Sequence, residues 1–186
     1  MKMLTQWFPT RLKKIGKIYL TTGKNHTFFG MYIESIGGKE VTVSTPHHVD
    51  ESLEYFGETL KGNVVNPATS QHFTITSEAK ELDDEKKECY HLITAKILWI
   101  MKRSRPDLES SVYFLCTRVQ CPTYEYWGRL RRVLNYLKAT KNNKRIMGSE
   151  DLLKLETWVY AFHAVHEDMR GHTGGCMPCG VPPPCG

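Results

Sequence analysis

The chain has 186 residues, of which 40% are hydrophobic and 24% are charged, and its formal net charge is +5. These proportions are ordinary for a globular chain with an apolar core, and the length fits one domain, or one domain and part of another. Lys96 and Lys102 break the longest apolar stretches, and no apolar stretch follows the first basic residues, so the pattern excludes a transmembrane helix and argues against a secretory signal.

The first quarter of the chain is typical of β-structure, except that residues 1–15 have no clear period. Lys17–Thr22 is predicted to form a strand, and His26–Ile36, which is rich in aromatic and β-branched residues, a second. Gly37 and Gly38 then turn the chain into a third strand, Glu40–Thr45. We therefore expect a small antiparallel meander.

A short helix is predicted after Pro46, because Val49, Leu53 and Phe56 fall on one side of it and Gly57 closes it. Residues 58–80 have a polar mixture interrupted by glycine and proline. We expect this segment to be irregular and to wrap the surface.

Three consecutive amphipathic helices are predicted from the next sixty residues. The first spans Glu85–Lys102 and ends at Pro106. Its apolar row, at spacings of three and four, is Cys89, Leu92, Ile93, Lys96, Ile97 and Ile100. The adjacent acids Asp83 and Asp84 fit the charged first turn of this helix, where negative groups favour the dipole.

The second and third helices follow short breaks. Asp107 is predicted to cap the second, and Thr123 the third, which spans about Tyr124–Thr140. Their inward rows are Leu108, Val112, Leu115 and Val119 in the second helix and Trp127, Leu130, Leu134 and Leu137 in the third. The resulting three-helix core has a basic outer face.

These helices also carry a family resemblance. Four blocks resemble, in order, the segment of copia-type LTR retrotransposon polyproteins that follows the polymerase palm: Ala95–Ile100, Lys102–Leu108, Phe114–Val119 and Trp127–Lys138. His26–Met31 with Ile33 and Glu34 resembles the palm strand pair just beyond the polymerase active site, although Tyr32 stands where relatives usually have an acidic residue. The match extends from about Gly16 to Gly175, and several blocks in fixed order are more specific than one motif.

The end of the chain resembles the start of a ribonuclease H domain. Arg145–Gly148 is predicted as a short strand or link, and Thr157–Val165 as a strand that the resemblance identifies with the first of that domain. His166, Asp168–Arg170 and His172–Gly175 match its turn and second strand. The expected fold is therefore α+β, with a palm-derived meander and loop over residues 1–80, a thumb- or connection-like helical segment over 81–143, a truncated ribonuclease H hairpin over 144–175 and a disordered tail over 176–186.

The resemblance implies that the catalytic carboxylates are missing. Reverse transcriptases hold two Mg²⁺ ions with carboxylates that lie, in family order, upstream of the strand at His26. Tyr160 stands where the resemblance calls for the first ribonuclease H aspartate, and a neutral phenol is no substitute for a hard carboxylate ligand. We expect no catalytic residue, metal site or cofactor in this chain, although Mg²⁺ serves complete relatives.

The cysteines leave one alternative open. Cys176 and Cys179 have the spacing of half a zinc site, which Cys185 and the histidines His163, His166 and His172 would have to complete. One such pair is weak evidence, and the surrounding glycines and prolines favour an oxidisable tail. Without an export signal, the expected compartment is a reducing intracellular one, cytoplasmic or nuclear.

Binding is the remaining function class. In complete relatives the helices after the palm grip the primer-template, and basic residues at matching positions would contact phosphates without reading sequence. The candidates for nucleic-acid binding are Lys102, Arg103, Arg105, Arg129, Arg132 and Lys138. Three alternatives stay open. These residues are only a solvated face, or the chain is an interaction module that pairs with itself or with a fuller polymerase chain through a sheet edge. The third is an enzyme that works in trans, completed by carboxylates from another polypeptide.

Overall fold

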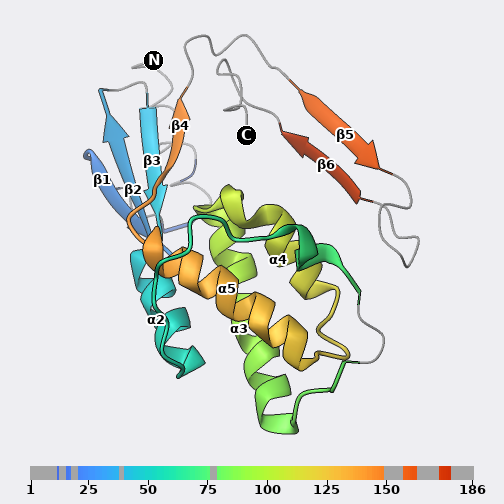
Figure 1. The fold of residues 1–186 in the computed structure, drawn as a ribbon. Helices are drawn as coiled ribbons and strands as arrows, with labels where there is room; N and C mark the ends of the chain where they lie inside the picture. The colour runs from blue at the N-terminus through green and yellow to red at the C-terminus, as the bar shows by residue number, and fades with distance from the viewer. Residues whose placement is uncertain are drawn as a thin grey trace.

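The computed structural model of the chain describes residues 12, 16–17, 21–37, 40–75, 79–148, 157–162 and 172–176. The described residues form an antiparallel four-stranded sheet, a separate two-stranded hairpin and four α-helices, which confirms the α+β class (Figure 1). None of the helices in these ranges is long and apolar enough to cross a membrane.

The four-stranded sheet has the strand order β1-β2-β3-β4, with every neighbouring pair antiparallel. Its strands are β1 (Asn25–Phe28), β2 (Met31–Ile36), β3 (Glu40–Ser44) and β4 (Arg145–Gly148). The first three follow one another along the chain, so an antiparallel meander is present as expected, although its first two strands are not the two that the sequence predicted.

The expectation of one continuous strand over His26–Ile36 is wrong, because the chain folds back on itself within this range. Phe28 pairs with Met31, and the two residues between them, Phe29 and Gly30, have φ values of 48° and 74°. Two successive positive φ values are the mark of a tight hairpin turn whose twist matches the strands. Of the strand expected over Lys17–Thr22, residues 18–20 lie outside the described residues, and Lys17, Thr21 and Thr22 are not in a strand.

The fourth strand comes from far along the chain. In β4, Met147 pairs with Val41 and Arg145 with Val43 of β3. Residues 145–148, which the sequence division placed with the ribonuclease H-like end, therefore belong to the same sheet as the meander.

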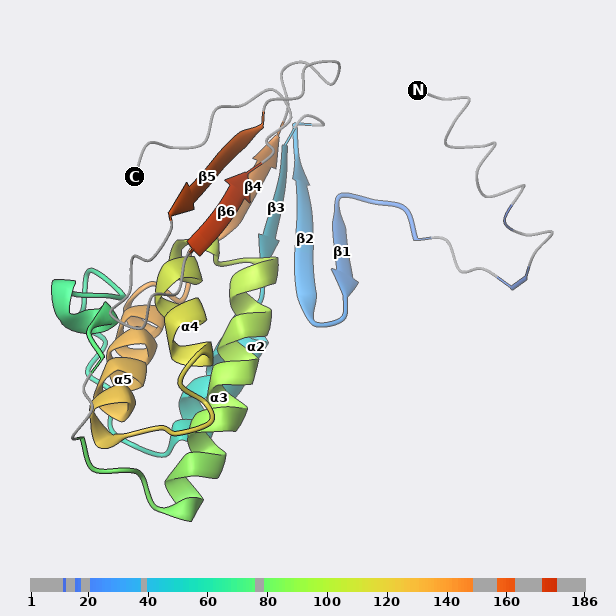
Figure 2. The ribbon, with the colours of Figure 1, turned by 90° about the vertical axis from the view of Figure 1, so that its right-hand side faces the viewer.

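The helices lie below this sheet in Figures 1 and 2, and their order matches the expected one. They are α2 (Pro46–Phe56), α3 (Asp84–Arg103), α4 (Glu109–Cys116) and α5 (Tyr124–Ala139), with short 3₁₀ turns η1 (Ser70–Phe73) and η2 (Pro106–Leu108). Gly57, with φ 68°, ends α2 in the left-handed conformation, as the sequence indicated.

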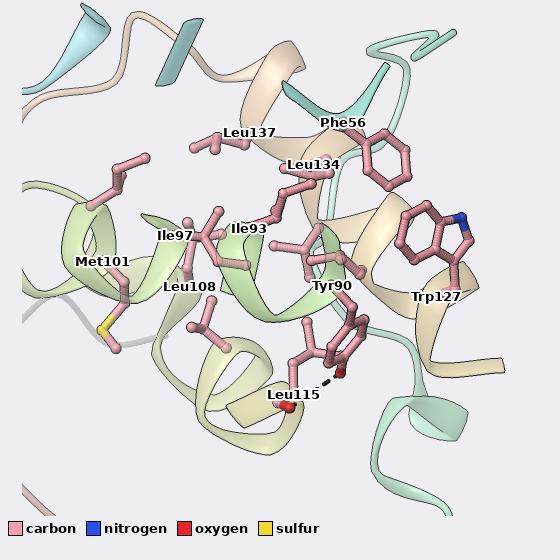
Figure 3. Close-up of a cluster of buried hydrophobic side chains, with 14 of the residues drawn as sticks. Phe56, Tyr90, Ile93, Ile97, Met101, Leu108, Leu115, Trp127, Leu134 and Leu137 are labelled. Carbon is pink, nitrogen blue, oxygen red and sulfur yellow. Dashed lines mark hydrogen bonds between the residues drawn. The ribbon is translucent and has the colours of Figure 1, made fainter. Parts of the chain in front are cut away.

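The core lies between α2, α3, α4 and α5 (Figure 3). Ile93, Ile97 and Ile100 of α3 are fully buried, and burying each such side chain stabilises the fold by about 1.5–3 kcal/mol. The expected α3 row was partly wrong, since Leu92 is 40% exposed and Tyr90 is buried instead. The Tyr90 hydroxyl donates to the Leu115 carbonyl oxygen at 3.1 Å, which satisfies the one polar group that the ring carries inside.

The inward rows of the other helices agree better with the sequence. Leu108, Val112 and Leu115 are fully buried, as are Leu130, Leu134 and Leu137 of α5. Trp127 stacks on Phe56 of α2 with ring centroids 4.9 Å apart, which joins the helix after the meander to the three-helix core. Helix α2, which follows the meander, therefore shares one core with α3, α4 and α5.

Capping agrees with the sequence at one helix and differs at another. The Asp83 carboxylate accepts the Lys86 backbone N–H at 2.9 Å and caps α3, which confirms the capping interpretation of this acidic pair. Asp107 does not cap the next helix, because its carboxylate binds Arg105 instead. Thr123 occupies the N-cap position of α5 without a side-chain capping hydrogen bond.

The last described elements are β5 (Trp158–Phe162) and β6 (His172–Cys176), which pair as an antiparallel hairpin. Phe162 pairs with His172 and Trp158 with Cys176. A strand pair was expected here, while the turn at Asp168 and the tail from residue 177 lie outside the described residues.

Candidate nucleic-acid interface

Two of the expected phosphate-binding cations are exposed at the carboxyl end of α3. Lys102 Nζ donates to the Tyr113 hydroxyl at 2.7 Å, and this hydrogen bond raises the pKa of Lys102, so the ammonium is charged at neutral pH. The Arg103 guanidinium lies 6.0 Å from the centre of the Trp99 ring. Both residues are solvent-exposed and adjoin an aromatic ring, an arrangement that suits contact with a polyanion.

Arg105, two residues further on, is a structural residue. It is only 2% exposed, and its Nε and Nη2 atoms donate to the Asp107 carboxylate at 2.9 and 2.7 Å. Its Nη1 donates to the Thr140 carbonyl oxygen at 2.9 Å, which places the cation at the carboxyl end of α5, where the helix dipole is negative. Arg105 is therefore withdrawn from any external phosphate.

Asp107 takes part in the same network. Burial acts to raise the pKa of Asp107, but the hydrogen bonds and charge of Arg105 outweigh it and hold the pKa below its usual value. The Tyr136 hydroxyl donates to the same carboxylate at 2.9 Å. The three side chains join the start of η2 to the last turn of α5.

Arg129 is also engaged inside the molecule. Its Nη1 donates to the carbonyl oxygens of His72 at 3.0 Å and Thr74 at 2.6 Å, and its guanidinium lies 5.0 Å from the Tyr126 ring centre. The side chain is only 14% exposed. This residue holds the segment around η1 against α5.

The other two expected cations lie on α5 as well. Lys138 Nζ donates to the Leu60 carbonyl oxygen at 2.8 Å, in the segment that follows α2. Arg132 is partly buried, and its Nε atom has no hydrogen-bond partner. Of the six candidates, Lys102 and Arg103 are thus the two whose cationic groups face solvent beside aromatic rings.

A row of α5 side chains holds the five residues Glu58–Gly62, which we call the strap. Sequence reasoning did not single out two members of this row, Arg131 and Asn135. Trp127 Nε1 and Arg131 Nη2 donate to the Glu58 carboxylate at 2.8 and 2.5 Å. The Asn135 side-chain oxygen accepts the backbone N–H groups of Lys61 and Gly62 at 2.7 and 3.0 Å. The spacing of these positions along α5, at 127, 131, 135 and 138, was the available signal.

His72 anchors the chain further along. It is 1% exposed, its Nε2 donates to the Ser111 carbonyl oxygen at 3.1 Å, and burial lowers its pKa. The neighbouring cations Arg129 and Arg132 lower the pKa further. The imidazole is therefore neutral at neutral pH.

The acidic residues form no metal site in the part of the chain that the structure describes, where no group of three or more His, Cys, Asp or Glu side chains is arranged to hold an ion. Asp83 is committed to capping α3, and this role lowers its pKa. Tyr160 lies in β5, opposite Gly174 of β6. Cys179, Cys185 and the histidines at 163 and 166 lie outside the described ranges.

Comparisons with protein-family models, with curated protein sequences and with solved structures each gave no match to this chain.

Proposed function

We propose that this chain is a catalytically incomplete fragment of a copia-type retrotransposon reverse transcriptase and ribonuclease H, which binds nucleic acid weakly and without sequence preference. The resemblance of the ordered blocks supports the family. The observation that carries the binding function is the exposed pair Lys102 and Arg103 beside the rings of Tyr113 and Trp99.

The lack of catalysis is argued from the chemistry of the carboxylates. Two-metal phosphodiester chemistry needs several hard oxygen ligands around two Mg²⁺ ions. The only adjacent aspartates in the sequence are Asp83 and Asp84, and they form the cap and first turn of α3. With Tyr160 in place of the first ribonuclease H aspartate, we propose that the chain has neither polymerase nor nuclease activity and needs no cofactor of its own.

If two cations bind phosphates, the salt dependence of the affinity can be estimated. Each phosphate contact to a single strand contributes a slope of about −0.7 to the dependence of log K on log salt, so two contacts give about −1.4. Raising the salt from about 50 to about 200 mM then weakens binding roughly sevenfold. The affinity at physiological salt is expected to be low, and the same for all sequences.

The experiment is fluorescence anisotropy with a labelled oligo-dT strand over this salt range. The K102Q/R103Q double variant is expected to lose most of the binding and most of the salt dependence. The matched control is K17Q/K24Q, which removes the same charge from two exposed lysines elsewhere. Equal losses in both double variants would show that net charge, and not the end of α3, is responsible.

A second candidate function is self-association, and the β1–β2 hairpin favours it. Phe28 is 57% exposed and Phe29 76% exposed, and β1 lies at the edge of the sheet among the described strands. Exposed apolar side chains beside an uncovered strand edge invite pairing with another chain. Size-exclusion chromatography with light scattering at several concentrations tests this, and a monomer at all of them would exclude it.

A further inference from the structure

We propose that the α5 row that holds the strap is a second polyanion-binding surface, and that the strap and nucleic acid compete for it. This inference rests on the proposed function, because it assumes that the external ligand is a nucleic-acid phosphate. We infer that Arg131 and Lys138 bind nucleic-acid phosphates when the strap does not occupy them. In Figure 1 the chain leaves the end of α2 and runs beside α5.

The first argument is the chemistry of the groups bound to the row. Arg131 binds a carboxylate oxygen of Glu58, and Lys138 binds the carbonyl oxygen of Leu60. Phosphate oxygens accept the same hydrogen bonds from the same donors. The row is therefore already arranged to hold oxygen ligands, one of them anionic.

The second argument is that the contact to the strap is polar and partly open to solvent. The side chains of Arg131 and Glu58 are 46% and 32% exposed, and an ion pair at such a position contributes little to stability. The one apolar anchor in the strap is Leu60, which is 6% exposed. The Glu58 carboxylate can therefore leave Arg131 without unfolding the core, as surface segments with few buried contacts open locally.

The third argument is that a neutral side chain positions the strap. Asn135 accepts the N–H groups of Lys61 and Gly62 and donates to the Arg131 carbonyl oxygen at 2.9 Å in its own helix. Gly62 has a φ of 64° and lies so close to α5 that a Cβ there would be 3.2 Å from Lys138 Cγ. Removing the Asn135 amide would loosen the strap while leaving every cation in place.

Two variants test the competition with labelled oligo-dT. E58Q removes the carboxylate that occupies Arg131, and its control is E88Q, which makes the same charge change at an exposed residue of α3. N135A loosens the strap with no charge change, and its control is N142A, at an exposed residue beyond α5. We expect E58Q and N135A to bind at least about threefold more tightly than their controls, with a salt slope steeper by about 0.7 for E58Q.

Repeating the test in a chain that carries K102Q/R103Q separates this inference from the proposed function. In a K102Q/R103Q background, E58Q should still gain affinity, and adding R131Q should abolish the gain. Tight binding by E58Q but none by the parent chain would support the strap and sink the α3 proposal. Equal affinities for E58Q and E88Q and for N135A and N142A, with thermal unfolding unchanged, would overturn the competition, as would the absence of binding in every variant.

Discussion

Arg105→Met is expected to destabilise the fold strongly, although Arg105 was predicted from the sequence to contact nucleic acid. Methionine keeps the apolar stem but removes the guanidinium that binds Asp107 and the end of α5 at Thr140. Truncating one partner of a buried ion pair costs about 3–5 kcal/mol. Since the Asp107 side chain is 37% exposed, water compensates part of the loss, and we expect about 2–4 kcal/mol.

The assay is urea unfolding followed by far-UV circular dichroism, with Arg103→Met as the matched control. Arg103 is exposed two residues earlier, so its replacement should change the free energy of unfolding by less than about 0.5 kcal/mol. In the binding assay we expect R103M to be the more impaired variant, because it loses the exposed Arg103 cation and folded R105M keeps it. Equal unfolding free energies for R105M and R103M would refute the structural role of Arg105.

The remaining predictions concern the core, one turn and one buried histidine. Tyr90→Phe should lower the free energy of unfolding by about 0.5–1.5 kcal/mol, because it removes one buried hydrogen bond while the Leu115 carbonyl oxygen keeps the Arg118 N–H; an unchanged urea midpoint would contradict this. Gly30→Ala should cost at least about 1 kcal/mol, since φ is 74° and the new Cβ would lie 2.3 Å from His48 Nε2. By contrast Gly128→Ala, with open space around the helix position, should stabilise by up to about 1 kcal/mol. Because burial lowers the pKa of His72 below its unfolded value, the unfolded chain binds the extra proton first as the pH falls below about 6.5. Stability should therefore decline there, and a His72→Leu variant should show less of this decline in urea titrations at pH 7 and 5.5.

The sequence was informative wherever a repeating pattern met a local stop signal. The three helices were found from spacings of three and four between apolar residues, and Gly57 marked the end of α2 correctly. Asp83 was recognised as a cap because acidic residues before an apolar row suit the start of a helix. These features depend on neighbours within a few residues.

Two kinds of feature were missed, a turn without a sequence signal and contacts between residues far apart in the chain. The turn at Phe29 was not foreseen, because a phenylalanine with a positive φ is not a sequence signal for a two-residue hairpin. Arg105 carries the same charge as Arg103, and only the approach of Thr140 from the end of α5 places it inside. Likewise, no residue near Arg131 in the sequence indicates that it forms an ion pair with Glu58.

The family and its catalytic deficit remain proposals that one activity measurement tests most directly. The measurement is incorporation of labelled deoxynucleotides on a primed RNA template by the homogeneous chain, with Mg²⁺ and with chelator. We predict the same signal in both, because we propose that the chain lacks the set of carboxylates that two-metal chemistry needs. Incorporation that rises with protein concentration and is abolished by the chelator would contradict this account.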